Sequence, residues 1–146
     1  MSEPRLVDLR AALDLAVSAT PVNAWWLRRQ VSAWLHRGSQ RSDRFDDLVL
    51  ATNEAVANVV DHAYVDRSDG PGLVRLMARD LPEAIQVVVA DDGNWRETVV
   101  GPFRGHGLKM VRALVDDVRI SRNGRGTVVE MCLPVSRLHS WMPGGT

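Results

Sequence analysis

Residues 51–63 read Ala-Thr-Asn-Glu-Ala-Val-Ala-Asn-Val-Val-Asp-His-Ala, a stretch that combines an apolar stripe with a polar pair. Glu54 and Asn58 are four residues apart, so on a helix their side chains lie on neighbouring turns of the same side. A carboxylate can accept a proton and an amide oxygen can bind a hard cation, and a Mg-nucleotide site requires both. The spacing alone is common, and it describes a solvated helix face equally well.

A helix over about 44–63 is expected around this pair. Its apolar side consists of Phe45, Leu48, Val49, Thr52, Ala55, Val56, Val59 and Ala63. At about 100° per residue, Glu54 lies nearly opposite the centre of this stripe, with Asn58 and Asp61 beside it. We therefore expect the pair on the side of the helix that faces away from the core.

The remaining elements follow from alternating and helical apolar patterns. They are a strand over 13–19, a helix over 22–37 opened by Pro21, a hairpin over 73–78 and 85–90, a helix over 108–116 and a hairpin over 118–121 and 127–133. This order predicts an α+β two-layer sandwich, in which a mixed, largely antiparallel sheet carries all helices on one face. We expect a single domain over 1–146, with a core over about 12–134 and a loosely held tail over 135–146.

The composition limits partners and location. The chain has 146 residues, with 18 Lys and Arg against 18 Asp and Glu, so its formal net charge is zero. Binding to nucleic acid or to an acidic membrane therefore has no electrostatic support. The single cysteine, Cys132, cannot form an internal disulfide. No apolar run reaches the length of a membrane span and the N-terminus has no signal-peptide core, so we expect a cytoplasmic protein.

Three glycine-bearing segments follow the 44–63 helix. An apolar strand ends in Asp91 and Gly93, where an acid can accept a hydrogen bond from an exocyclic amine and a glycine lets a flat ring approach. Residues 105–108, Gly-His-Gly-Leu, precede a helix, so free N–H groups and the positive helix end favour an anion there. Gly126 and Thr127 begin the last strand. Taken singly, the segments also describe a strand end, a flexible helix entry and a hairpin turn.

In order, the four segments resemble the N-box, the two glycine boxes and the terminal Gly-Thr element of the GHKL (Bergerat-fold) ATPase superfamily. The chain is most similar to the anti-sigma-factor serine/threonine kinases of the RsbW and SpoIIAB type. The stretches 54–64 (Glu-Ala-Val-Ala-Asn-Val-Val-Asp-His-Ala-Tyr) and 91–96 (Asp-Asp-Gly-Asn-Trp-Arg) are especially similar to actinobacterial members. The resemblance covers about residues 12–134, nearly the whole chain.

The resemblance implies a role for each motif residue. Glu54 would be the general base that takes the proton from a serine hydroxyl or a water. Asn58 would ligate the Mg²⁺ that bridges the ATP phosphates. Asp91 would bind the adenine amine, with Gly93 beneath the ring and Thr127 supporting that contact.

The second glycine box is expected to bind phosphate. Gly105 and Gly107 would let residues 94–106 act as an ATP lid and bring backbone amides to the phosphates, with Leu108 completing this nucleotide-binding segment. The chain departs from the family pattern at Trp95, where the first glycine box has a second glycine, and its lid is short, about a dozen residues. Both departures could weaken nucleotide binding, and neither removes the base or the metal ligand.

The implied function is that of an ATP-binding anti-sigma factor. It would hold a sigma factor and phosphorylate a serine or threonine of an anti-anti-sigma (STAS-domain) partner, and so regulate transcription by partner switching. In the resembled family the region of the first helix contributes to homodimers. Trp25, Trp26 and Trp34 on that helix fit a core or a subunit interface equally well.

Two alternatives remain. A non-catalytic GHKL-fold binding module with weak or lost nucleotide binding is favoured by Trp95 and the short lid, whereas the intact pair of Glu54 and Asn58 favours the kinase. The other alternative is the catalytic domain of a histidine kinase. It is disfavoured because no heptad-patterned helix with a phosphorylatable histidine precedes the motifs.

Overall fold

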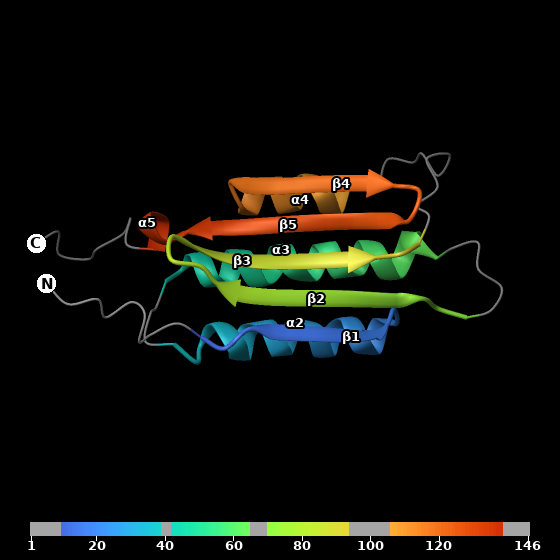
Figure 1. Ribbon diagram of the computed structural model, residues 1–146, viewed down its shortest axis with the longest axis horizontal. Helices are drawn as coiled ribbons and strands as arrows, with labels where there is room; N and C mark the ends of the chain where they lie inside the picture. Colours follow the sequence, from blue (N-terminus) through green and yellow to red (C-terminus); the bar gives the residue numbers. More distant parts are fainter. Residues whose placement is uncertain (1–9, 39–41, 65–69, 94–105, 139–146) are drawn as a thin grey trace, which may run out of the picture.

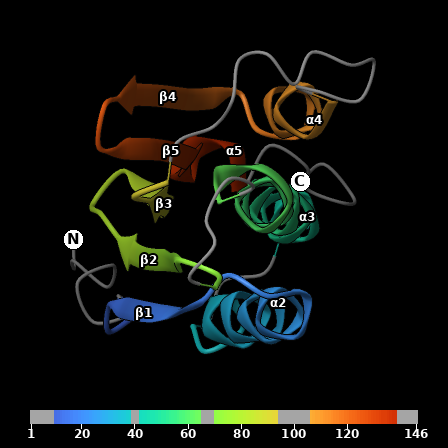
Figure 2. The same ribbon diagram turned by 90° about the vertical axis from the view of Figure 1, so that its right-hand side faces the viewer.

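The computed structural model describes residues 10–38, 42–64, 70–93 and 106–138. Its elements are β1 (Leu13–Ser18), α2 (Pro21–Leu35), α3 (Arg44–Asn58), the π-helical turn η1 (Val59–Ala63), β2 (Leu73–Asp80), β3 (Ala84–Asp91), α4 (His106–Leu114), β4 (Asp117–Asn123), β5 (Gly126–Pro134) and α5 (Val135–Leu138). Figures 1 and 2 show a layer of strands against a layer of helices, which confirms the predicted α+β two-layer sandwich.

Within the described residues the sheet has five strands in the order β1-β2-β3-β5-β4. The sequence predicted a mixed, largely antiparallel sheet, but every pairing in the described residues is antiparallel. Strands that follow one another through a short turn pair in this way, as β2 with β3 and β4 with β5 do. The central strand β3 ends at Asp91, which pairs with Val74 on one side and with Thr127 on the other.

The core lies between the sheet and the helices α2, α3 and α4, which cover the same face of the sheet (Figure 2). Every residue of the predicted α3 stripe is buried. The helix α3 lies between α2 and α4 and contacts both. Because of these neighbours, burial extends beyond the stripe: Ala51, on its flank, is 0% exposed.

The helix α2 begins where the sequence predicts. Thr20 is its N-cap, and its Oγ1 accepts a hydrogen bond from the Asn23 amide at 3.2 Å. Pro21 follows in the first turn, where its missing N–H removes no helical hydrogen bond. These two residues together fix the start of the helix.

The three tryptophans of α2 divide between the core and the surface. Trp34 is 0% exposed, and its Nε1 donates a hydrogen bond to the Ala11 carbonyl oxygen at 2.7 Å. Trp25 and Trp26 are 58% and 37% exposed. Only Trp34 is therefore a core residue, because one side of the helix faces the sheet.

Two boundaries differ from the prediction. The α-helix ends at Asn58 instead of residue 63, because the chain continues as the wider π-helical turn η1. The predicted tail over 135–146 begins with α5. Val135 is buried, and its amide donates a hydrogen bond to the Glu83 carbonyl oxygen at 2.9 Å, so the first turn of this segment is held by the β2–β3 connection.

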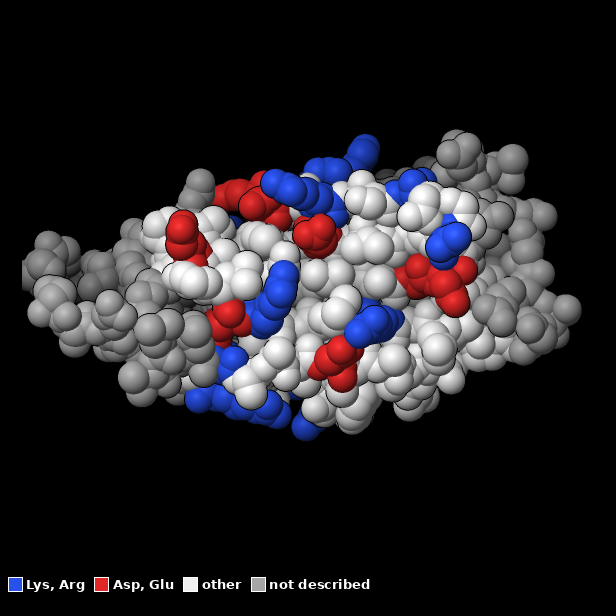
Figure 3. Space-filling model, viewed as in Figure 1, with Lys and Arg blue, Asp and Glu red and all other residues white. Residues whose placement is uncertain are grey.

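The other face of the sheet, here called the open face, carries no helix in the described residues (Figure 1). Acidic and basic side chains are interspersed on it (Figure 3). One exposed pair joins Arg75 Nη2 to Asp14 Oδ2 at 2.9 Å, and the hydrogen bond from Arg75 lowers the pKa of the Asp14 carboxyl. Among the described helices, none combines the length and the apolar character needed to cross a bilayer.

Candidate functional site

Four of the predicted motifs meet at one end of the sheet. The helix α3 and the strand β3 end there, and α4 and β5 begin there (Figure 1). The antiparallel topology causes this, since α4 and β5 run opposite to α3 and β3. Segments that are far apart in the sequence therefore share one edge of the molecule.

Asn58 is the last residue of α3 and is 8% exposed. Its Nδ2 has no hydrogen-bond partner among the described residues. A buried polar group without a partner costs about 1–3 kcal/mol, so buried amides are almost always paired in native proteins. Glu54, one turn earlier, is only partly buried. The pair therefore consists of one sheltered amide and one carboxylate that solvent or a partner can reach.

Asp91, the predicted adenine ligand, lies at the end of β3 opposite Thr127. Its Oδ1 accepts a hydrogen bond from the Gly93 amide at 2.9 Å, which fixes the turn after the strand. Thr127 is 3% exposed. Gly126 before it has a φ of +146°, and a Cβ there would overlap the Asp91 carbonyl oxygen. Glycine is required at this position, because any side chain would push β5 away from Asp91.

Gly93 lies against the end of η1. A Cβ on Gly93 would overlap the Ala63 carbonyl oxygen. The backbone after β3 is therefore in direct contact with the backbone at the end of η1. Here the chain runs in the wider π-helical turn η1. Such π-helical turns within helices recur at functional sites.

Part of the predicted site lies outside the described residues. Gly105, Trp95 and the rest of the lid segment 94–105 belong to this part. Gly107 is the second residue of α4. Leu108 is half-buried and packs against the core, so it has a packing role, and its contact with a nucleotide stays a prediction.

Tyr64 lies at the same end of the sheet, and the sequence did not single it out as a site residue. Its hydroxyl is 2.6 Å from Asp92 Oδ1 and accepts a hydrogen bond from the Asp92 amide at 3.1 Å. Its burial, and next the hydrogen bond to Asp92, raise the pKa of Tyr64 to about 12. The available signal was its position at the end of the family-like stretch 54–64. Its contact, 28 residues away along the chain, left no pattern in the sequence.

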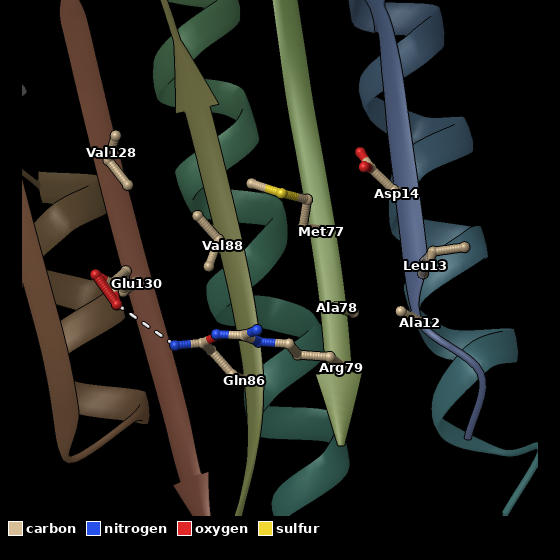
Figure 4. A pocket seen from close by; sticks show the side chains of 10 residues that line it. All are labelled: Ala12, Leu13, Asp14, Met77, Ala78, Arg79, Gln86, Val88, Val128 and Glu130. Atoms are coloured by element: carbon tan, nitrogen blue, oxygen red, sulfur yellow. Dashed lines mark hydrogen bonds between the residues drawn. The ribbon is translucent and has the colours of Figure 1, made fainter. Parts of the chain in front are cut away.

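A hollow of about 390 Å³ on the open face does not coincide with these residues (Figure 4). Met77, Val88 and Val128 line it, and Gln86 Nε2 donates a hydrogen bond to Glu130 Oε1 at 3.4 Å across its edge. Successive residues of a strand face opposite sides of a sheet, so Val88 and Asp91 point to different faces. We therefore do not assign the nucleotide to this hollow.

An antiparallel five-stranded sheet, helices on one face and this meeting of four motif ends define an ATPase domain of the histidine kinase type. The model of the family described as the histidine kinase-like ATPase domain matches residues 17–133, and the chain belongs to this family. The family that the sequence motifs predicted is thereby confirmed.

Similar proteins include several bacterial kinases. The serine-protein kinase RsbW of Bacillus subtilis (strain 168) is 27% identical over 135 residues, which cover 82% of this chain and 82% of the relative. RsbW of Staphylococcus aureus (strain MRSA252) is 24% identical over 132 residues, which cover 80% of this chain and 82% of the relative.

Solved structures with the same fold include an RsbW domain and a histidine kinase. The crystal structure of the RsbU and RsbW domains of a Mycobacterium tuberculosis protein has a TM-score of 0.66 and 27% identity, with 84% of this chain matched to 32% of that chain. A blue-light activated histidine kinase of Erythrobacter litoralis has a TM-score of 0.58 and 25% identity, with 82% of this chain matched to 49% of that chain. This chain therefore spans half or less of each of these two solved chains.

Proposed function

We propose that this chain binds ATP and transfers its γ-phosphoryl group to a serine or threonine of a protein partner. Membership of an ATPase domain family and similarity to relatives named serine-protein kinase support the proposal. The observation that carries it is Asn58 Nδ2, which is buried and has no hydrogen-bond partner among the described residues, one turn after the accessible Glu54 carboxylate.

The side chains present fit a Mg²⁺ ion. Mg²⁺ takes oxygen ligands and is usually held by one or two protein groups together with water and substrate phosphates. Rotating the Asn58 amide by half a turn exchanges its nitrogen and oxygen, so the unpaired position suits an oxygen ligand. Among the described residues no three His, Cys, Asp or Glu side chains form a metal site by themselves. When bound, Mg²⁺ would neutralise charge on the phosphates.

Glu54 would act as the general base. Its carboxylate would take the proton from the partner's hydroxyl while that oxygen forms a bond to the γ-phosphorus and the bond from phosphorus to the ADP oxygen breaks. ADP leaves with the electron pair of the broken bond. The partner then carries a phosphoserine or phosphothreonine.

The other motif residues would hold the nucleotide. Asp91 would accept a hydrogen bond from the adenine amine, Gly93 would lie beneath the ring, and Thr127 would support this contact. Gly105 and Gly107 would bring backbone amides to the phosphates, because a helix N-terminus attracts anions.

The regulatory part of the proposal draws on the relatives. The chain would hold a sigma factor and would also phosphorylate a serine or threonine of an anti-anti-sigma, STAS-domain partner. Phosphorylation of that partner would free the kinase to hold the sigma factor again. A sigma-factor partner implies action in the cytoplasm. The exposed Trp25 and Trp26 of α2 support a homodimer in which this helix contributes to the contact. One domain with a core over about 12–134 would carry these activities.

Calorimetric titration with Mg-ATP and Mg-ADP tests nucleotide binding, with Asn58→Ala as the control. We expect micromolar binding in the wild type and none in the variant. Glu54→Gln should keep nucleotide binding and abolish phosphotransfer to a STAS-domain protein from the same genome. Unchanged transfer would exclude Glu54 as the base. No wild-type binding up to millimolar nucleotide would leave a docking module that only keeps the fold.

A further inference from the structure

Tyr64 joins segments that are far apart in the sequence. Its hydroxyl lies 2.6 Å from the Leu73 carbonyl oxygen at the start of β2 and 2.6 Å from Asp92 Oδ1 after β3, so its hydrogen goes to one of these acceptors. The same oxygen accepts a hydrogen bond from the Asp92 amide at 3.1 Å. Since Tyr64 directly follows η1, its hydroxyl ties the end of the long helix to two strands.

The ring of Tyr64 packs against Gly72. A Cβ on Gly72 would overlap the ring, and the Gly72 carbonyl oxygen accepts a hydrogen bond from the Ala19 amide at 2.8 Å. Gly72, against which the Tyr64 ring packs, is therefore held to the end of β1. A tyrosine held at both its ring and its hydroxyl has little freedom to move.

Asp92 is the middle residue of the turn Asp91–Gly93. The outer residues of this turn are also held, since the Gly93 amide donates to Asp91 Oδ1 at 2.9 Å and Gly93 lies against the Ala63 carbonyl oxygen. Two consecutive residues, Ala63 and Tyr64, thus hold the turn together. The carboxylate expected to contact the base belongs to this turn.

We propose that Tyr64 is a positioning residue of the nucleotide site, whose hydroxyl fixes the Asp91–Gly93 turn and thereby orients the Asp91 carboxylate towards the base. This inference rests on the proposed binding of ATP at this end of the sheet. A carboxylate only accepts hydrogen bonds. Adenine offers an amine donor at the relevant position, whereas hypoxanthine offers a carbonyl acceptor. The orientation that Tyr64 enforces therefore determines the preference for ATP over ITP.

The experiment compares affinities of ATP, ADP and ITP in the wild type, Tyr64→Phe and Thr52→Val. The Thr52 hydroxyl donates to the Leu48 carbonyl oxygen at 2.8 Å within α3, so Thr52→Val removes a hydrogen-bonded hydroxyl outside the proposed site. We expect Tyr64→Phe to lower the ATP to ITP affinity ratio about tenfold, the effect of one lost hydrogen bond to a charged group. The ATP to ADP ratio should stay unchanged, and Thr52→Val should change neither ratio.

An unchanged ATP to ITP ratio in Tyr64→Phe overturns the inference, and so does an equal loss of affinity for both nucleotides, which a purely structural role would give. If the wild type prefers ATP and Tyr64→Phe keeps this preference, the role of Tyr64 is contradicted while the proposed binding of ATP stands. A wild type that binds no nucleotide overturns the proposed function as well.

Hydrogen exchange of the Asp92 amide tests the contact without any nucleotide. This amide should exchange about tenfold faster in Tyr64→Phe, because its acceptor is lost. An equal exchange rate in the two proteins would contradict the role of the hydroxyl.

Discussion

Arg10 and Asn58 lie at opposite ends of the sheet, and their buried polar groups differ in how they are paired. At the end where β2 stops, the Arg10 guanidinium donates to Asp80 Oδ1 at 2.9 Å and to the Leu35 carbonyl oxygen at 2.8 Å, with the Trp34 ring beside it. The side chains of this ion pair are 2% and 5% exposed. At the opposite end, the buried Asn58 Nδ2 has no hydrogen-bond partner among the described residues.

One group is paired within the fold, whereas the other has a buried nitrogen without a partner, as the proposed role of Asn58 in ligand binding requires. Breaking a buried ion pair by removing one partner is costly, so the pair of Arg10 and Asp80 constrains the chain before β1 and the end of β2. An unpaired buried amide lowers the stability of the free protein. Natural proteins tolerate such a cost chiefly where function requires the group.

The largest expected effect is at the paired end. Arg10→Met leaves the buried Asp80 carboxylate without its cationic partner, with only the backbone amide of residue 10 still donating to it, and we expect the free energy of unfolding to fall by about 3–5 kcal/mol. Urea denaturation measures this change. The matched control is Arg75→Met, which removes the exposed partner of Asp14 and should leave the denaturation midpoint unchanged. Equal midpoints for the two variants would erase the distinction between the buried and the exposed pair.

At the other end of the sheet we expect a small effect on stability and a large effect on nucleotide binding. Asn58→Ala removes an amide whose burial is not compensated, so the free energy of unfolding should change by no more than about 1 kcal/mol. Nucleotide binding should be lost in the same protein. Denaturation without nucleotide, beside calorimetry, checks both parts. A destabilisation as large as that of Arg10→Met would make Asn58 a structural residue.

The contact between Gly93 and η1 sharpens the comparison further. Gly93→Ala places a methyl group onto the Ala63 carbonyl oxygen, and we expect a loss of about 1–3 kcal/mol in stability together with weaker nucleotide binding. A Cβ on Gly124 would meet nothing within 4 Å, so Gly124→Ala is the matched control and should change neither quantity. Full nucleotide affinity in Gly93→Ala would show that the contact does not shape the site.

The smallest effect concerns the ionisation of Tyr64, the only tyrosine in the chain. Burial, and next the hydrogen bond to Asp92, raise its pKa to about 12, above the usual value near 10. A raised pKa stabilises the folded protein below about pH 10, and this contribution is lost as the pH rises through about 12. Tyrosinate absorbance of the folded and urea-unfolded chain measures the shift. Coincident titration curves would contradict the hydroxyl contact with Asp92.

The sequence predicted what depends on local pattern. The stripe of α3 is buried as the periodicity required, and Gly126 stands where the last hairpin turns. The burial of Asn58 was not predicted. The apolar periodicity identifies the side of the helix that faces the sheet, but it does not show that neighbouring helices cover the flanks of α3. Ala51 lies on the same flank two turns earlier and is also buried, which the helices on either side of α3 explain.

Contacts between distant segments left no pattern to read. Arg10 and Asp80 are 70 residues apart. Taken alone, each is a charged residue of the kind that usually lies at the surface. The π-helical turn was missed because the apolar residues continue through 59–63 with helical spacing. The meeting of the four motif ends follows from strand order, which the sequence motifs implied only through the family that they resemble.

The opposite directions of α3 and α4 have an electrostatic consequence for whatever binds between their ends. The C-terminal end of a helix carries partial negative charge and the N-terminal end partial positive charge. At this edge the helical segment formed by α3 and η1 ends and favours a cation, while α4 begins and favours an anion. A metal–phosphate pair bound here would be favoured in the orientation that places the metal towards the end of α3 and η1, so the backbone would help to select the direction in which a nucleotide enters.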